Sequence, residues 1–165
     1  MTTDARFNNW FTWLLQWEGT GFENDPDDPG GATKYGIDQR SHPKEDIRHL
    51  TRERAAEIYW QTYWTAMHCH EMPLKVGEVV GNIAVNAGPG RAAGWLQTAL
   101  GVVADRQIGP KTLAALKGQD PAHLANVLLE RTEQHYRSIA NGRLAKFLKG
   151  WLNRNRDLKR YIDKL

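Results

Sequence analysis

The opening segment of the chain carries hydrophobic residues at helical spacing. Four of them occupy positions i, i+3, i+4 and i+7 of one helix face: Phe7, Trp10, Phe11 and Leu14. Thr3 or Asp4 can cap the first turn, and Gly19 supplies the left-handed residue that often ends a helix. The pattern predicts an amphipathic helix whose last turn contains Glu18.

Residues 19–37 break this periodicity. The segment is rich in glycine and contains the turn-forming sequences Asn-Asp-Pro and Asp-Pro-Gly-Gly. Residues 32–37 can form a short extended strand. We therefore expect an irregular loop or small β-hairpin directly after the first helix.

From residue 51 onward the pattern becomes helical again. Further helices are predicted to begin close to five positions: Thr51, Pro73, Arg91, Pro110 and Pro121. A basic amphipathic helix is expected at the end of the chain. The predicted fold class is all-α, with many short helices and one glycine-rich insertion.

Composition limits the choice of function without deciding it. The chain has 165 residues, 41% of them hydrophobic and 25% charged, as in an ordinary globular protein. Its net charge of +3 is compatible with an anionic polymer as partner. The N-terminal sequence lacks the features of a signal peptide, and no apolar run is long enough to span a membrane. We expect synthesis in the cytoplasm, no membrane insertion and a monomer.

The loop after the first helix gathers acidic, hydroxyl and aromatic residues. Cleavage of a glycosidic bond needs one carboxylic acid to protonate the leaving oxygen and a second group to assist at the anomeric carbon. Glu18, at a helix end beside tryptophans, suits the acid. Asp27 lies on the polar loop and suits the second role, for which Asp25 and Asp28 are alternatives.

The spacing of these residues resembles known lysozymes. Glu18, Asp27 and Thr33 follow the pattern Glu-x8-Asp-x5-Thr, which is similar to the catalytic set of phage-type lysozymes. Residues 17–37 resemble more closely the signature of the glycoside hydrolase family 108 muramidases, Asn-Asp-Pro-x-Asp-Pro-Gly-Gly-x-Thr-x-Tyr-Gly-Ile. The similarity recurs at 84–90 and at 105–116.

This resemblance implies a lysozyme-like fold and cleavage of peptidoglycan glycan strands between N-acetylmuramic acid and N-acetylglucosamine. It implies Glu18 as the catalytic acid. Members of the family are bacteriolytic endolysins of phages or prophages, and some carry the label secretion activator. The resemblance also implies a catalytic region at 1–90 and a helical peptidoglycan-binding-like region at 91–165, packed as one compact unit.

Other residues of the matching segments receive roles with open alternatives. Thr33 can position the attacking water, or it can be a structural strand residue. Tyr35, Asp28 and Asn86 are candidates for substrate binding, although Tyr35 can equally buttress the loop and Asn86 can stabilise a helix end. Asn82 stands where family members often have Asp.

The sequence His68-Cys69-His70 invites comparison with a metal site. A zinc site needs three or four ligands at recognisable spacing, and adjacent residues point in divergent directions. No second cluster completes the set. We expect no metal and no cofactor.

Three other functions are compatible with parts of the pattern. A lytic transglycosylase also uses one glutamate, and a lysozyme scaffold can serve as a non-catalytic module for wall binding or secretion. The basic C-terminal helix alone suggests nucleic acid, but no groove-reading motif accompanies it. We expect peptidoglycan as the partner, reached in the periplasm or cell wall through a holin or another export route.

Overall fold

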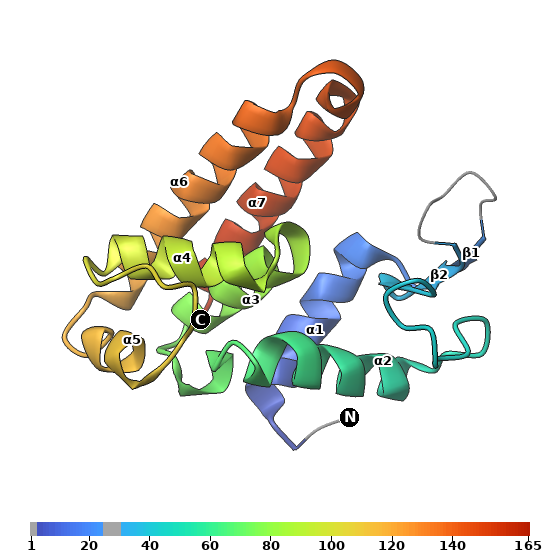
Figure 1. Ribbon diagram of the computed structural model, residues 1–165, viewed down its shortest axis with the longest axis horizontal. Coiled ribbons are helices and arrows are strands. Elements are labelled where there is room, and N and C mark those ends of the chain that lie inside the picture. The colour runs from blue at the N-terminus through green and yellow to red at the C-terminus, as the bar shows by residue number, and fades with distance from the viewer. Residues whose placement is uncertain (1–2, 25–30) are drawn as a thin grey trace. The chain divides into compact units, whose positions relative to one another are not determined.

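The computed structural model describes residues 3–24 and 31–165 (Figure 1). The predicted mainly α, lysozyme-like fold is confirmed. The chain divides into two compact units, residues 1–62 and 63–165, which are described separately below. The division at residues 90 and 91 that the sequence suggests stays a prediction.

The first unit contains two helices and a small antiparallel sheet with strand order β1-β2-β3. Its elements are α1 (Ala5–Glu18), β1 (Phe22–Glu23), β2 (Thr33–Lys34), β3 (Ile37–Asp38) and α2 (Arg52–Tyr59). The Asp4 side chain caps α1 by accepting a hydrogen bond of 2.9 Å from the backbone N–H of Phe7. The hairpin predicted after the first helix is present as β2 and β3.

Aromatic rings form the core of the first unit. Phe7 stacks on Phe11 with ring centroids 5.7 Å apart and meets Trp60 edge-on at 5.1 Å. Phe11 also contacts Tyr59, at 5.4 Å between centroids. Because Phe7 and Phe11 are fully buried, these contacts fix α1 against the end of α2.

The turn between β2 and β3 uses two residues in the left-handed region. Lys34 pairs with Ile37, so Tyr35 (φ 55°) and Gly36 (φ 73°) form a two-residue hairpin loop. Positive φ at both central positions is what a type I′ turn requires. The hydroxyl of buried Tyr59 donates a 3.0 Å hydrogen bond to the Tyr35 carbonyl and holds the turn against α2.

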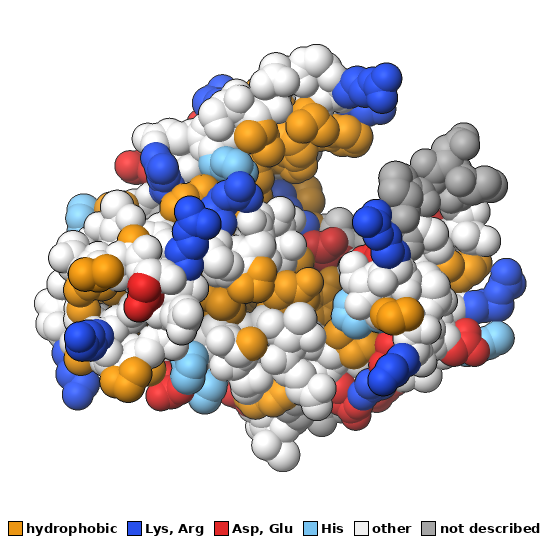
Figure 2. Space-filling view, viewed as in Figure 1, with side chains coloured by type: hydrophobic (Ala, Val, Ile, Leu, Met, Phe, Trp, Pro, Cys, Tyr) orange, Lys and Arg blue, Asp and Glu red, His pale blue; other side chains and the backbone are white. Residues whose placement is uncertain are grey.

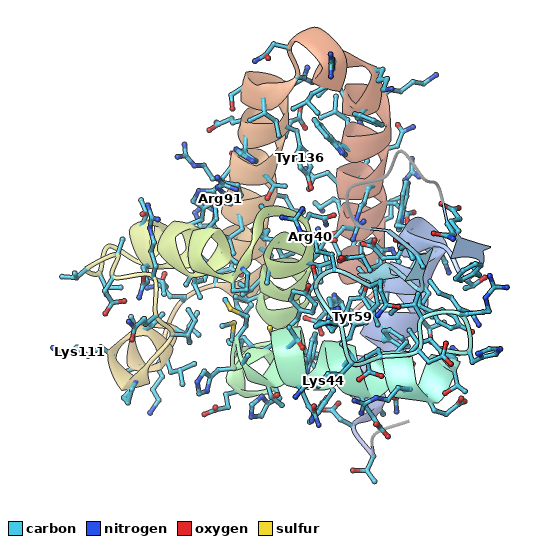
Figure 3. The ribbon with its side chains drawn as sticks, turned by 45° about the vertical axis from the view of Figure 1, so that its right-hand side comes forward. Arg40, Lys44, Tyr59, Arg91, Lys111 and Tyr136 are labelled. Carbon is cyan, nitrogen blue, oxygen red and sulfur yellow. The ribbon has the colours of Figure 1, made fainter. Side chains whose placement is uncertain are left out.

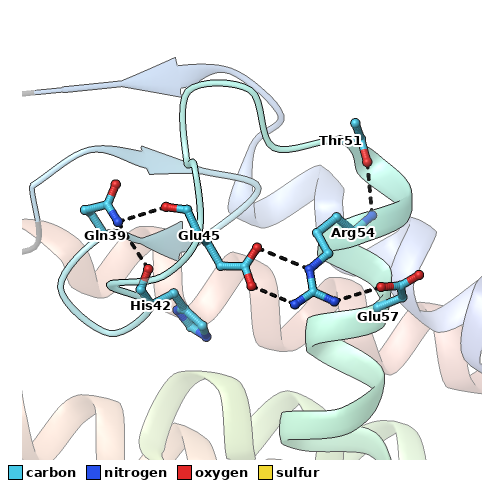
Figure 4. A network of polar contacts seen from close by, with 6 residues as sticks. All are labelled: Gln39, His42, Glu45, Thr51, Arg54 and Glu57. Atoms are coloured by element: carbon cyan, nitrogen blue, oxygen red, sulfur yellow. Dashed lines mark hydrogen bonds and ion pairs between the residues drawn. The ribbon is translucent and has the colours of Figure 1, made fainter.

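The irregular segment between β3 and α2 is fixed by polar contacts (Figure 4). The Gln39 side-chain amide donates to the backbone carbonyls of His42 and Glu45, at 3.2 and 2.9 Å. Arg54 on α2 pairs with Glu45 at 2.6 Å and with Glu57 at 2.8 Å. Hydrogen bonds from Arg54 lower the pKa of Glu45, and the two carboxylates raise the pKa of Arg54. The loop is thus tied to the helix that follows it.

The second unit is helical throughout its regular elements. A π-helix, η1 (Trp60–Thr65), continues α2 into it and is followed by η2 (Cys69–Glu71), α3 (Val76–Ala87), α4 (Pro89–Ala99), α5 (Pro110–Ala115), α6 (Pro121–Ile139), η3 (Gly142–Phe147) and α7 (Leu148–Asp163). Figure 1 shows α6 and α7 as a neighbouring pair, and α3 packs against both α4 and α6. Helix α6 begins at Pro121 as predicted, and the Asp120 side chain caps it by accepting a 2.9 Å bond from the N–H of Ala122.

The buried face of α3 includes a polar link to α7. Asn82 is 1% exposed, and its side-chain carbonyl accepts a 3.1 Å hydrogen bond from Nε of Arg154. Asn86, one turn later, donates to the same Asn82 oxygen at 2.9 Å. The amide at position 82 therefore has a structural use within the second unit.

Neither described stretch, 3–24 or 31–165, contains a helix with the length and apolar character needed to cross a membrane.

Replacing Gly36 by Ala should lower the free energy of unfolding by about 2–4 kcal/mol, measured by urea denaturation. A non-glycine residue in the left-handed region costs about 1–2 kcal/mol, and overpacking adds about 1–3 kcal/mol. The added Cβ would lie 2.5 Å from the Tyr59 hydroxyl oxygen, which is buried and held by Tyr35.

Gly21 provides the matched control. A Cβ at Gly21 would meet no atom within 4 Å, and its φ is not in the left-handed region. Its replacement by Ala should change stability by no more than about 0.5 kcal/mol. Equal losses from the two substitutions would contradict the tight turn as the cause.

Candidate active site

Glu18 occupies the last turn of α1, as the sequence predicts. The helix ends there because Gly19 adopts a positive φ of 76° and its N–H bonds to the Leu15 carbonyl at 3.1 Å. Glu18 is half-buried, and its Oε1 atom is shielded from solvent. A carboxylate at this end opposes the helix dipole, a local conflict typical of functional positions.

The Glu18 carboxyl group meets two other groups at the hairpin turn. An ideal Cβ on Gly36 would lie 2.9 Å from Oε2 of Glu18, 3.0 Å from Cβ of Glu18 and 2.5 Å from the Tyr59 hydroxyl. The carboxyl oxygen and the phenol oxygen therefore approach the same point on the turn backbone. Only glycine leaves room for both of them there.

This arrangement gives the half-buried Glu18 carboxyl group a defined position beside the hairpin turn. The α1 end, the turn and α2 each supply one of the converging groups, and Figure 3 labels Tyr59 among the side chains of α2. A carboxyl group fixed in this way can serve as a general acid or base toward a bound substrate.

Thr33 and Tyr35 lie on the same hairpin. Thr33 pairs across the sheet with Glu23 and Asp38, and its hydroxyl makes a long 3.4 Å hydrogen bond to the Gly31 carbonyl. Tyr35 is half-buried and offers its carbonyl to Tyr59. The structure thus places Glu18, Thr33 and Tyr35 in the first unit, while their roles in water positioning and substrate binding stay predictions.

The structure does not describe the segment that contains the predicted second carboxylate. Asp27, its alternatives Asp25 and Asp28, and the substrate-binding role of Asp28 all fall outside the described residues.

Asp38 is a described carboxylate on the hairpin that the sequence reasoning did not single out. Burial acts to raise its pKa, but hydrogen bonds from Ser41 and the nearby charge of His42 lower it below the ordinary value. Asp38 accepts a 2.8 Å bond from the Ser41 N–H. It is therefore an ionised turn-capping residue opposite Thr33 at neutral pH.

Asn86, the remaining predicted substrate-binding residue, belongs to the second unit. It is exposed on α3, and its side-chain amide donates to both the backbone and side-chain oxygens of Asn82 at 2.9 Å.

The His68-Cys69-His70 sequence is occupied by local contacts. His68 Nδ1 lies 2.6 Å from Glu71 Oε1, and Cys69 is fully buried. Within the described part of the chain, no group of three or more His, Cys, Asp or Glu side chains could hold a metal ion.

Tyr59 is a functional residue of the first unit that the sequence analysis does not single out. The signal for a buried aromatic ring is helical spacing, and this spacing says nothing about where a phenol hydroxyl points. In the sequence, Gly36 is one glycine of the turn-rich segment 19–37. Its second requirement, close approach of two side chains, becomes visible only in three dimensions.

Comparisons with known proteins find two family models and a similar solved structure. Residues 11–88 match the model of glycosyl hydrolase 108, and residues 91–156 match that of a predicted peptidoglycan domain. The chain is similar to the solved structure of SagA from Brucella abortus, at 29% identity and a TM-score of 0.81 over 94% of this chain and 92% of that chain. A comparison with curated proteins finds no significant match.

The two family models follow one another and together cover most of the chain. A glycosyl hydrolase domain joined to a peptidoglycan domain indicates a hydrolase that acts on peptidoglycan. Residues 11–88 therefore resemble the glycosyl hydrolase 108 family, in agreement with the motifs seen in the sequence.

Proposed function

We propose that the protein is an N-acetylmuramidase, a lysozyme that hydrolyses the β-1,4 bond between N-acetylmuramic acid and N-acetylglucosamine. The observation that carries this proposal is the convergence of the Glu18 carboxyl group, the Gly36 backbone and the Tyr59 hydroxyl. Support comes from the match to glycosyl hydrolase 108, which includes all three residues.

Glu18 is the general acid in this proposal. It transfers its proton to the glycosidic oxygen while the bond from that oxygen to the anomeric carbon breaks. A water molecule then forms the new bond to the anomeric carbon. The assisting carboxylate either accepts the proton of this water, or stabilises the positive anomeric carbon while the ionised Glu18 accepts the proton. Asp27 is our first choice for that carboxylate, with Asp25 and Asp28 as its alternatives.

Four residues have the remaining proposed roles. Thr33 positions the attacking water, and Tyr35, Asp28 and Asn86 contact the sugar chain. Tyr59 does not touch the reacting atoms; it is a positioning residue that fixes the turn beside Glu18 through the Tyr35 carbonyl. In this division of labour residues 1–90 carry the catalysis and residues 91–165 contact the wall. The biological setting we propose is a phage or prophage endolysin that reaches the wall through a holin or another export route.

Replacement of Glu18 by Gln should reduce kcat on purified sacculi by at least about 100-fold, because general acid catalysis contributes about 10²–10⁴-fold. The amide has nearly the same size but no proton of suitable acidity. Turbidity clearing gives the rate, and sedimentation with sacculi shows whether the variant still binds the wall.

Glu53→Gln is the control for the lost charge. Glu53 is exposed in the first turn of α2, within the same unit. This variant should clear sacculi at the wild-type rate. Full activity of Glu18→Gln would refute the proposed acid.

Product analysis separates hydrolysis from its closest alternative. Mass spectrometry of a wild-type digest should find reducing muramic acid ends. Anhydro-muramic ends would instead identify a lytic transglycosylase, and sacculi left intact by the wild type would favour a wall-binding module without catalysis.

Replacement of Tyr59 by Phe should lower kcat by about ten- to a hundredfold, because small displacements of a catalytic group carry penalties of this size. It should also lower the free energy of unfolding by about 1–3 kcal/mol, since the Tyr35 carbonyl loses its donor. Steady-state kinetics and urea denaturation measure the two effects.

The kinetic split distinguishes positioning from stability alone. Below the melting range, a positioning role predicts reduced kcat in fully folded enzyme. A variant that loses stability and keeps wild-type kcat would show that Tyr59 serves only the fold.

A further inference from the structure

The second unit contains a basic cleft. It has a volume of about 520 Å³ and is formed by α4, the residues before it, the loop at 104–106 and α6. Its lining includes three arginines and one tryptophan: Arg91, Arg106, Arg131 and Trp95. Its size is that of an ordinary ligand site.

Arg106 is held in the cleft by an unusual backbone. Its φ of 65° lies in the left-handed region, which arginine rarely adopts. The side chain lies across the glycine face of α4, since a Cβ on Gly94 would sit 3.5 Å from Cγ of Arg106 and one on Gly90 would sit 4.0 Å from its Cδ. Larger residues at these two positions would crowd the arginine stem.

Gln97 fixes the loop that carries Arg106. This side chain is 1% exposed, and its carbonyl accepts a 2.9 Å bond from the Arg106 N–H. Its amide donates to Asp105 Oδ1 at 2.7 Å and to the Gln107 carbonyl at 2.8 Å. The buried Gln97 side chain thus bonds to three successive residues, 105–107, and these bonds stabilise the left-handed backbone conformation of Arg106.

Arg131 and Arg91 reach the cleft from α6 and α4. The guanidinium of Arg131 lies over the Trp95 ring, 5.7 Å from its centroid, and Arg91 donates to the Ala87 carbonyl at 2.8 Å. Figure 2 shows basic side chains gathered over α4 and α6, and Figure 3 labels Arg91. Among the described residues, no carboxylate pairs with Arg91, Arg106 or Arg131.

The positive charge of the cleft also affects His135, which lies beside Trp95. Its ring meets Trp95 edge-on at 5.2 Å. Burial lowers the pKa of His135, and the positive charges of Arg91 and Arg131 lower it further. Arg91 and Arg131 therefore both act on His135 as cations.

We propose that this cleft binds the carboxylate groups of the peptides attached to peptidoglycan. Guanidinium groups bind carboxylates in bidentate geometry, and Trp95 with the short side chains around it can pack against the peptide's apolar parts. This inference rests on the proposed function, because it takes peptidoglycan as the substrate and adds the part of it that the second unit recognises.

A peptide fits the cleft better than a phosphate polymer does. The cleft is short and local, whereas a polyanion needs a continuous basic track. Asp105 adjoins Arg106, and its pKa is lowered by hydrogen bonds from Gln107 and Gln97, so a negative charge interrupts such a track. All three arginines also fall within the segment matched by the predicted peptidoglycan domain.

Calorimetry with the full-length Glu18→Gln variant tests this proposal without bond cleavage. The ligands are a soluble disaccharide tetrapeptide with free carboxylates and the same muropeptide with its carboxylates amidated. The free-acid form should bind at least about tenfold more tightly, and the added substitutions Arg106→Ala and Arg131→Ala should abolish this preference.

Arg143→Ala with Lys149→Ala is the charge-matched control. Both residues are exposed and lie outside the cleft, so this pair should retain the preference. The free-acid ligand should also raise the pKa of His135 toward its ordinary value, as followed by NMR titration. That shift reports on the cleft itself and not on overall charge.

Equal affinity for the two muropeptides would overturn the proposal, as would a preference that survives the loss of Arg106 and Arg131. Tighter binding of a glycerol phosphate polymer would assign the cleft to another anion. Binding by the Glu18→Gln variant and lysis by the wild type are measured separately. Sacculi left intact by the wild type, together with carboxylate-dependent binding by the variant, would refute the muramidase and support the cleft.

Discussion

The packing of the first unit requires a residue without a Cβ atom at position 36, which is glycine. At this point the end of α1, the β2–β3 turn and α2 come close enough for Glu18 and Tyr59 to reach the same backbone position. Gly36 also has the positive φ that the two-residue turn needs. One residue type therefore satisfies a conformational and a steric requirement together, and the placement of the proposed acid follows from both.

The two units share one feature of backbone conformation. In the first, Tyr35 has a left-handed backbone and its carbonyl is held by the buried Tyr59 hydroxyl. In the second, Arg106 has a left-handed backbone and its N–H is held by buried Gln97. A strained residue persists when its surroundings over-determine it, and strain of this kind concentrates at functional sites. The parallel strengthens the case that the loop at Arg106 has a use beyond connecting α4 to α5.

The helices were predictable because their signals are local. Asp4, Gly19, Thr51 and Asp120 each stand at the helix end where capping chemistry favours them, and the structure has a helix boundary at each. The position of Glu18 on the last turn of α1 followed from the same signals. Spacing within one segment is enough to fix such features.

The contacts that build the site were not predictable in this way. Tyr59 and Gly36 are 23 positions apart in the sequence. Gln97 donates a hydrogen bond to the Thr112 hydroxyl, which is 15 positions away. A buried aromatic or amide residue looks like ordinary core in the sequence, because periodicity reports burial and not the partner of a polar atom. Asn82 shows the same limit: its departure from the family pattern was visible, but its bond to Arg154 on α7 was not.

The net charge of the chain predicts its attraction to an anionic ligand only when the ion pairs of each cation are also known. Arg54 pairs with two glutamates, Arg137 with Glu133, and Lys159 with Asp163, so these cations are largely neutralised where they stand. Such exposed pairs add little stability. They do remove positive charge from the surface that a wall polymer meets. In the described part of the second unit, Arg91, Arg106 and Arg131 have no such carboxylate partner, and they share one cleft. The modest excess of +3 thus understates the local field, and attraction to an anionic ligand should depend on these three side chains far more than on the total.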